Sequence, residues 1–225
     1  MNIQRRMPFF TAVNIDGASY DALKSQVPTR KEIGPDKWFF DPRLPKTQQL
    51  AASFYKGNDF DIGHIVRRED ALWGDTLEFA LRANNDTFHL TNACPQHKDF
   101  NRNAMRWLGL EDYALKNARR YGLKISVYSG PVFRESDTTF NDVLIPASFW
   151  KVITMIKDDG TPSSTAYMIQ QDDLIEEMQK QSFVYDQFKT YQVPISEIEQ
   201  LTGISFFLNQ PRLNAISILE LAHSA

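Results

Sequence analysis

The sequence predicts an α+β fold in which helices pack on a central, mostly antiparallel sheet. Short runs of β-branched and aromatic residues recur along the chain and indicate strands. Two of these runs flank Asp158-Asp159-Gly160, a turn typical of hairpins. One long stretch, 103–121, has the composition of a helix. The chain has no repeat, low-complexity tract or long linker, so we expect a single domain over residues 1–225.

The first half of the chain should hold strands separated by turns, because β-branched and aromatic runs alternate with proline and glycine. In order, we expect a strand (Phe9–Ile15), a turn (Asp16-Gly17), an irregular surface segment (27–46), a short strand (Phe60–Val66), a linking helix (Thr76–Ala83) and a second strand (Thr87–Asn92). The second strand should stop at Pro95, since proline cannot donate a ladder hydrogen bond.

The second half should open with the helix at 103–121, which Gly122 would cap. After it we expect a strand (Ile125–Ser129), a hairpin (Phe149–Ile156 with Thr165–Gln170) and two short helices (Ile175–Lys180 and Ser196–Leu201). Ser196 and Glu199 have the spacing of an N-cap and its capping-box partner.

Composition excludes several classes of protein. Hydrophobic residues make up 42% and charged residues 24% of the chain, as in soluble globular proteins. No apolar run approaches the roughly 20 residues that span a bilayer, so we expect no membrane partner. No signal peptide is recognisable after Met1, but a mature or excised form would look the same, which leaves the localisation unknown. A single cysteine, Cys94, excludes an internal disulfide and argues against a structural zinc site.

The charge is unevenly distributed. The formal net charge is −3, yet residues 98–124 carry seven Lys or Arg against three acids. Residues 125–225 carry six Lys or Arg against thirteen acids. The basic segment could attract phosphate groups, or it could be an ordinary solvated helix face.

Three residues have the chemistry needed to cleave a phosphodiester bond with one magnesium ion. His64 follows Gly63 in a predicted strand and could take a proton from water near neutral pH. Asn101 could offer an amide oxygen to Mg²⁺, and Glu111 shares a helix face with Trp107, four residues earlier. Taken singly, His64 is more simply interpreted as a structural histidine and Glu111 as an exposed helix acid.

In their order and spacing, these residues resemble the signature of the DNA/RNA non-specific endonucleases, a family of ββα-metal (His-Me finger) nucleases. The matching motifs are Asp61-Ile62-Gly63-His64, Asn92-Ala93-Cys94-Pro95-Gln96, Asn101 and Trp107-Leu108-Gly109-Leu110-Glu111. Weaker similarities extend the resemblance over about 9–207, which we take as the domain core. The resemblance implies that His64 is the general base, that Asn101 binds one Mg²⁺ (Mn²⁺ could substitute), and that Glu111 holds the water shell of the ion. Products with a 5′-phosphate are implied as well.

The sequence departs from the family pattern at three points. Ile62 replaces an arginine, whose catalytic role Arg67 or Arg68 could take over. Leu115 stands where a helix arginine is expected, leaving Lys116 and Arg119 as substitutes. The gap between Asn101 and Trp107 is two residues longer than the pattern, so Asn103 is an alternative metal ligand.

The remaining predictions concern substrate contacts and the core. We expect the substrate to be bound by Asp61, Asn92, Arg43, Arg102, Lys116 and Arg119, although Arg43 could equally be a plain surface residue. Cys94 and the four tryptophans (Trp38, Trp73, Trp107 and Trp150) are expected in the core.

These observations favour a Mg²⁺-dependent nuclease that contacts the backbone phosphates of DNA, RNA or both, whatever their sequence. The alternative is a catalytically weak or inactive nucleic-acid-binding domain, which Ile62 favours. A phosphodiesterase acting on a small nucleotide is a third interpretation. An inhibitor or regulatory domain is an expected partner, because an unrestrained nuclease would damage its own cell, and a homodimer is also considered.

Overall fold

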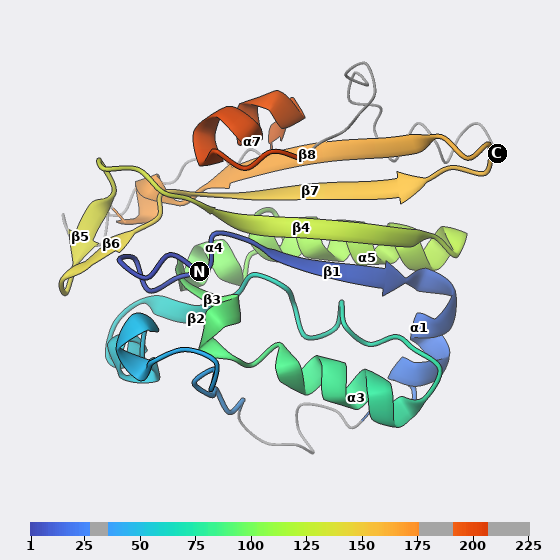
Figure 1. Cartoon of the computed structure of the whole chain (residues 1–225), viewed down its shortest axis with the longest axis horizontal. Helices are drawn as coiled ribbons and strands as arrows, with labels where there is room; N and C mark the ends of the chain where they lie inside the picture. The colour runs from blue at the N-terminus through green and yellow to red at the C-terminus, as the bar shows by residue number, and fades with distance from the viewer. Residues whose placement is uncertain (28–35, 176–190, 207–225) are drawn as a thin grey trace.

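The computed structural model describes residues 1–27, 36–175 and 191–206 and centres on a five-stranded sheet (Figure 1). Its strands, in spatial order, are β1 (Thr11–Asp16), β4 (Lys124–Val132), β7 (Ser148–Ile156), β8 (Pro162–Gln170) and β9 (Tyr191–Val193). Each neighbouring pair is antiparallel. The predicted α+β class with a central antiparallel sheet is therefore confirmed.

Helices cover both faces of this sheet, α5 (Trp107–Tyr121) on one and α7 (Ile195–Thr202) on the other (Figure 1). Side chains alternate between the two faces of a strand. Along β7, Phe149 and Ile153 accordingly join the core on the α5 side, whereas Trp150 and Val152 pack with Ile198 of α7. The centre of the sheet is thus shielded from water on both sides.

A second unit places two strands next to α5. Strand β2 (Phe60–His64) pairs antiparallel with β3 (Ala93–His97), and α4 (Lys98–Asn101) follows β3 directly. The strand expected at Thr87–Asn92 is wrong, because that segment ends in a 3-10 turn (Leu90–Asn92) and β3 begins after it. Pro95 lies inside β3, which among the described residues pairs with β2 alone, and a proline without an N–H is tolerated in such an edge strand.

Two further helices, α1 (Gly17–Lys24) and α3 (Leu77–Asp86), lie in the first half of the chain. The linking helix expected near 76–83 is confirmed as α3. The turn expected at Asp16-Gly17 is instead the start of α1, because the Asp16 carboxylate accepts a hydrogen bond from the Ala18 backbone N–H (3.0 Å) and so caps the helix.

Helix α5 is shorter than predicted. It begins at Trp107 rather than at 103, since Oδ1 of Asn103 accepts a hydrogen bond from the Met105 backbone N–H (2.8 Å) and holds that segment in a turn. The predicted C-cap is confirmed, with Gly122 left-handed at φ 60°.

In the second half, the predicted strands at Ile125–Ser129 (β4) and in the hairpin (β7 and β8) are confirmed. A small hairpin, β5 (Thr138–Phe140) with β6 (Val143–Ile145), was not expected. The capping box predicted for Ser196 is wrong: α7 begins one residue earlier, and the Glu199 side chain accepts a hydrogen bond from the Phe206 N–H (2.9 Å). Apart from Ile175, the helix predicted at 175–180 lies outside the described residues.

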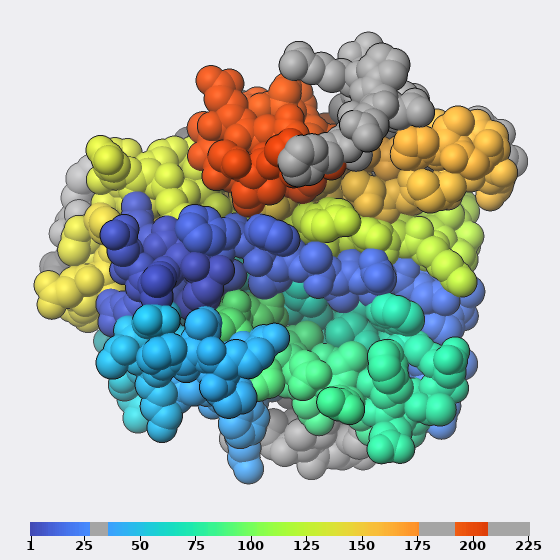
Figure 2. Space-filling model, in the orientation of Figure 1, coloured from blue at the N-terminus to red at the C-terminus, as the bar shows by residue number. Residues whose placement is uncertain are grey.

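Long-range contacts join the parts of the molecule. The buried Gln171 side chain accepts a hydrogen bond from the His97 N–H (2.9 Å) and donates to the carbonyl oxygens of Pro95 (3.2 Å) and Pro146 (2.8 Å). In Figure 2 the amino-terminal residues lie against the light-blue segment after residue 36, where the Leu50 N–H donates to the Arg6 carbonyl oxygen. No helix in the described ranges is long and apolar enough to cross a membrane.

Candidate active site

A hollow of about 860 Å³ lies where β2, α4 and the first turns of α5 meet. Most of the predicted site residues line it: Asp61, His64, Arg67, Arg68, Asn101, Arg102 and Glu111. Their side chains come from separate elements, so only the packing of the two-stranded unit against α5 brings them together.

His64 is the last residue of β2, and its ring is held by aromatic neighbours. The ring centroid lies 4.4 Å from that of Trp38 and 4.8 Å from that of Phe88, which meets it edge-on. The indole Nε1 of Trp107 donates a hydrogen bond to the His64 carbonyl oxygen (3.2 Å). Main chain and imidazole are therefore both positioned at the wall of the hollow, as a general base requires.

Gly63 permits the close approach of the two strands. A side chain at this position would overlap the buried Gln96 side chain of β3. The absent Cβ therefore lets β2 and β3 pack tightly beside His64.

Asp61 orients Asn101. Its carboxylate accepts hydrogen bonds from Nδ2 of Asn101 (2.9 Å) and Nε of Arg102 (2.8 Å). A carboxylate only accepts, so it selects the amide orientation in which Oδ1 of Asn101 is left for a cation. Asn103 does not line the hollow, and its amide oxygen bonds Met105 instead. The geometry thus supports Asn101 over Asn103 as the metal ligand, with the extra residues accommodated in the turn at 102–106.

Glu111 is buried at the edge of the hollow. Its burial raises the pKa of the carboxyl group to about 8, against the opposing charges of Lys151 and Arg67. Among the described residues, Oε1 of Glu111 has no hydrogen-bond partner. A buried carboxylate oxygen of this kind would be satisfied by the waters of a bound cation.

The donor set fits a hydrated magnesium ion. No group of three His, Cys, Asp or Glu side chains that could hold a metal occurs within residues 1–27, 36–175 and 191–206. A cation here would depend on the Asn101 amide oxygen, water and substrate phosphate, a coordination that Mg²⁺ accepts.

Two arginines place positive charge in the hollow despite the loss of the motif arginine at Ile62. Arg67 pairs with Asp70 (3.3 Å) and Asp112 (2.7 Å), and these charges raise its pKa despite burial. Arg68 pairs with Asp36 at 3.6 Å. Ile62 itself lines the hollow and adds an apolar wall.

Asn92, a predicted substrate contact, does not line this hollow. Its buried side chain accepts a hydrogen bond from the Val66 N–H (3.0 Å) and donates to the carbonyl oxygens of Val66 and Thr87 (both 2.9 Å). These bonds hold the segments at Val66 and Thr87 together, and a substrate contact by Asn92 stays a prediction.

The structure also places three predicted basic contacts outside the lining of the hollow. Arg119 faces α1, where it pairs with Asp21 (2.5 Å), and Arg43 pairs with Asp41 (2.6 Å) beside a different hollow. Lys116 is exposed and lies 3.5 Å from Asp112, which does line the hollow. None of these three side chains lines the hollow, and their predicted substrate contacts stay predictions.

Sequence reasoning missed part of the site. Trp107 and Trp150 are fully buried as expected, but Trp38 and Trp73 are only half-buried, and Trp38 lines the hollow beside His64. The available signal was the position of Trp38 in the proline-rich irregular segment, because aromatic residues on loops often belong to sites. Cys94 is buried as predicted, and burial raises the pKa of its thiol.

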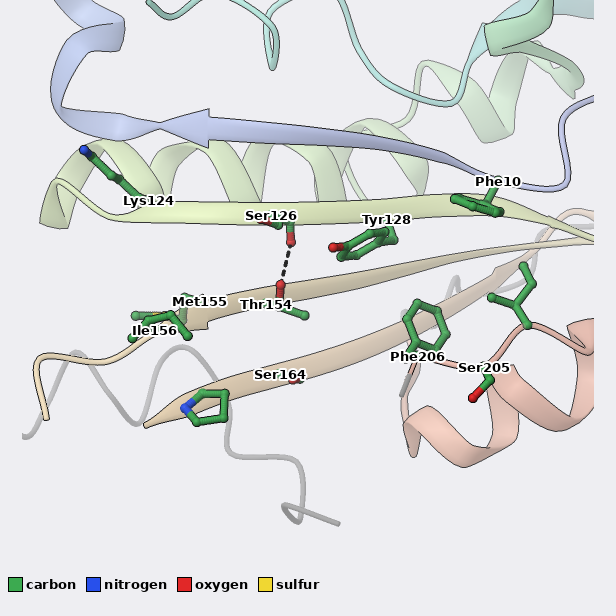
Figure 3. Close-up of a pocket in the computed structure, with 12 residues that line it drawn as sticks. Phe10, Lys124, Ser126, Tyr128, Thr154, Met155, Ile156, Ser164, Ser205 and Phe206 are labelled. Carbon is green, nitrogen blue, oxygen red and sulfur yellow. Dashed lines mark hydrogen bonds between the residues drawn. The ribbon is translucent and has the colours of Figure 1, made fainter. Parts of the chain in front are cut away.

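A second hollow, of about 440 Å³, lies on the sheet face away from α5 (Figure 3). Hydroxyl side chains of β4, β7 and β8 line it together with the rings of Phe10, Tyr128 and Phe206. None of the predicted site residues faces it. The chemistry predicted from the sequence therefore belongs to the first hollow.

Comparison with known proteins gives consistent matches. The chain matches the family model described as DNA/RNA non-specific endonuclease over residues 1–213. It is 38% identical over 91% of its length to protein y4fB of Sinorhizobium fredii, covering 31% of that protein. It is 26% identical over 93% of its length to mitochondrial nuclease 1 of Schizosaccharomyces pombe, covering 63% of it. The chain thus spans less than two thirds of each relative.

A solved structure shares the fold. The matched chain comes from the crystal structure of the EndoG/EndoGI complex, with a TM-score of 0.67 and 20% identity. The match covers 93% of the present chain and 82% of the other. The ββα-metal fold expected from the sequence is thereby confirmed.

Proposed function

Because the chain belongs to the DNA/RNA non-specific endonuclease family, we propose that it hydrolyses phosphodiester bonds in DNA, RNA or both without regard to sequence. The observation that carries this proposal is that His64, Asn101 and Glu111 line one hollow although they lie on β2, α4 and α5. Family membership supports a nuclease and a metal requirement, and the residue roles below are our inference from the geometry.

In the proposed reaction, His64 takes a proton from a water molecule, whose oxygen attacks the phosphorus. The P–O3′ bond breaks, the 3′-oxygen leaves and takes a proton, and the new end carries a 5′-phosphate. Mg²⁺, or Mn²⁺ in its place, would supply positive charge at the phosphoryl and leaving oxygens when held by Asn101. Glu111 would hold its water molecules, and Asp61 keeps the Asn101 amide in the required orientation.

Indifference to sequence follows from the groups available for binding. Arg68 and Arg102 can contact phosphates, and Arg102 is 69% exposed. Phosphate contacts carry no base information, and they weaken as salt rises. Nucleic acid is therefore the proposed substrate, bound through its backbone.

Retention of a buried acid argues against the alternative of a binding domain without activity. Burying the Glu111 carboxyl group beside a hollow is costly unless a ligand or counter-charge compensates. A pure binder of polyanions gains nothing from that cost. A phosphodiesterase acting on a small nucleotide is separated from a nuclease only by comparing substrates.

A protein inhibitor is a second partner that we propose for this chain. The structure with the matching fold, the EndoG/EndoGI complex, concerns the inhibition of EndoG, which is a property of that protein. The physical argument for the present chain is that cleavage without sequence preference must be restrained inside a cell. The expected homodimer stays a prediction.

Digestion of plasmid DNA and total RNA by the purified protein, with Mg²⁺ or with EDTA, tests the proposal. We expect cleavage with Mg²⁺ only, and His64→Ala should lower the rate by about 10²–10⁴-fold through loss of the general base. His89→Ala is the matched control, because that half-buried ring bonds the Asp86 carbonyl oxygen and does not line the hollow.

Cleavage unchanged in His64→Ala would refute the assigned base. Substrates left intact by folded protein across divalent ions would instead favour the binding domain.

A further inference from the structure

Two adjacent arginines, Arg67 and Arg68, follow β2 and line the candidate active site, but they are bonded very differently. All three guanidinium nitrogens of Arg67 already donate, to Asp70 (3.3 Å), to Asp112 (2.7 Å) and to the Glu111 carbonyl oxygen (3.4 Å). Two carboxylates thus neutralise this cation, and the three bonds brace the segment after β2 against α5. A phosphate would have to displace a carboxylate to reach Arg67.

The guanidinium of Arg68 is far less committed. Its ion pair joins Nη1 to Oδ1 of Asp36 at 3.6 Å, which is longer than a hydrogen bond. Its Nε is buried and has no hydrogen-bond partner within residues 1–27, 36–175 and 191–206. The main chain of Arg68 is fixed, because its carbonyl oxygen accepts a hydrogen bond from Nδ2 of the buried Asn84 (2.7 Å). The backbone is therefore anchored, while the guanidinium is able to bind an anion.

The other basic side chains that line the hollow are held by acids. Arg102 donates to the Asp61 carboxylate (2.8 Å), and Lys24 donates to the Glu69 carboxylate (2.5 Å). Among the described residues, Arg68 is thus the lining Lys or Arg whose carboxylate partner lies beyond hydrogen-bonding distance.

Arg68 lies close to the proposed general base. Its guanidinium carbon is 5.7 Å from the centre of the Phe88 ring, and the same ring meets the His64 imidazole edge-on with centroids 4.8 Å apart. Phe88 is buried, so both groups contact one fixed surface, and both line the hollow. A phosphate placed for attack by a water molecule at His64 would therefore lie within reach of this cation.

Strand β2 itself offers no cation beside His64. Ile62 lies two residues earlier, so its side chain points to the same face of the strand, and it lines the hollow. Isoleucine cannot donate a hydrogen bond to a phosphate. The negative charge that grows on the phosphoryl oxygens during cleavage must then be met by a side chain from another segment.

We propose that Arg68 is a catalytic residue that donates hydrogen bonds to the non-bridging oxygens of the scissile phosphate, whereas Arg67 is a positioning residue that braces α5. The inference rests on the proposed function, because it assigns a role in phosphodiester cleavage. A planar guanidinium can donate two parallel hydrogen bonds to a phosphate, and the long pair with Asp36 is readily exchanged for them.

Arg68→Ala and Arg67→Ala test the two roles by thermal denaturation and by the kinetics of cleavage of an oligonucleotide that the wild type cleaves. Arg68→Ala should lower kcat by about 10²–10³-fold at a melting temperature near that of the wild type, through loss of one group that stabilises developing charge. Arg67→Ala should lower the melting temperature, because the buried Asp70 loses its ion-pair partner. Arg82→Ala is the matched control and should change neither, since Arg82 is exposed on α3 and does not line the hollow.

Two further variants separate a phosphate contact from a structural ion pair. Ile62→Arg combined with Arg68→Ala should be more than about tenfold faster than Arg68→Ala, because an arginine at 62 would face the same hollow. Asp36→Ala removes the acid that competes for the guanidinium, so kcat should stay at least at the wild-type level. A purely structural pair would lose as much from Asp36→Ala as from Arg68→Ala.

The assignment would be overturned by wild-type kcat in folded Arg68→Ala, by a folded double variant no faster than Arg68→Ala, or by equal losses in Arg68→Ala and Asp36→Ala. In each of these cases the wild type still cleaves nucleic acid, and the proposed function stands. A folded wild type that cleaves neither DNA nor RNA would refute the proposed function and this assignment together. If Arg68→Ala does not fold, Arg68→Gln serves as the uncharged variant.

Discussion

His64 and Asn101 are held in place by different physical means. The imidazole is held by the rings of Trp38 and Phe88, whereas the Asn101 amide is held by a charge-assisted hydrogen bond to Asp61. Both side chains are oriented before any substrate binds. The entropy of orientation is then lost on folding and not during the reaction.

Asp61→Ala should therefore lower the rate of cleavage more than the removal of an exposed acid elsewhere on the surface. Without the carboxylate, the Asn101 amide can rotate and Arg102 loses its partner, so we expect a fall in kcat/KM of about 10–100-fold. Asp59→Ala is the control, since Asp59 forms an exposed ion pair with Lys98 (2.7 Å). Steady-state kinetics at several Mg²⁺ concentrations would measure the difference, and equal activity of the two variants would contradict the role of Asp61.

At the scale of elements, the spacing between Asn101 and Glu111 depends on the turn at 102–106 and its contact with α5. Gly109 lies in the first turns of that helix, directly against the carbonyl oxygen of Ala104. This close approach packs the turn at 102–106 against α5. The packing thereby sets the distance between the Asn101 amide and the Glu111 carboxyl group.

Gly109→Ala tests this contact. In an open helix the change stabilises by about 1 kcal/mol. Here the new Cβ would overlap the Ala104 backbone, and overpacking costs about 1–3 kcal/mol, so the overlap should win. We expect a lower free energy of unfolding in urea together with reduced cleavage. Arg120→Ala, at an exposed position of α5, should change stability by less than about 0.5 kcal/mol. A more stable Gly109→Ala protein would show that the turn does not depend on this approach.

At the scale of the whole molecule, the site requires the two-stranded unit to stay docked on the large sheet. Gln171, after β8, bonds two residues of β3 and the Pro146 carbonyl oxygen. Arg106, just before α5, pairs with Asp173 (2.7 Å). These contacts join the part that carries His64 to the large sheet.

Gln171→Ala should loosen this junction. It leaves three buried backbone groups without their partner, each at about 1–3 kcal/mol, of which some is recovered by water. With roughly 2–4 °C per kcal/mol in a chain of this size, the melting temperature should fall by about 5–10 °C. Cleavage should decline as well. Gln170→Ala, one residue earlier and exposed, is the control for thermal denaturation, and equal melting temperatures would contradict the docking role.

The sequence by itself determined the features that depend on close neighbours. Gly122 ends α5, the turn at 158–160 joins β7 to β8, and the order of His64, Asn101 and Glu111 pointed to the family. Such features are encoded within a few residues, because caps, tight turns and motif spacings are local. The prediction was wrong where the same residue type suits two local structures. Aspartate is common in turns and at helix N-caps, and here Asp16 caps α1 instead of forming the predicted turn.

Only the tertiary structure decided which charges meet. Arg67 and Arg68 line the hollow, whereas Arg43 and Arg119 pair elsewhere, although all four are plausible phosphate contacts in the sequence. Lys151, on a strand far along the chain, is buried on the face of the large sheet that packs against α5. The physical reason is that burial and counter-charge depend on packing between distant elements, which no local pattern of residues records.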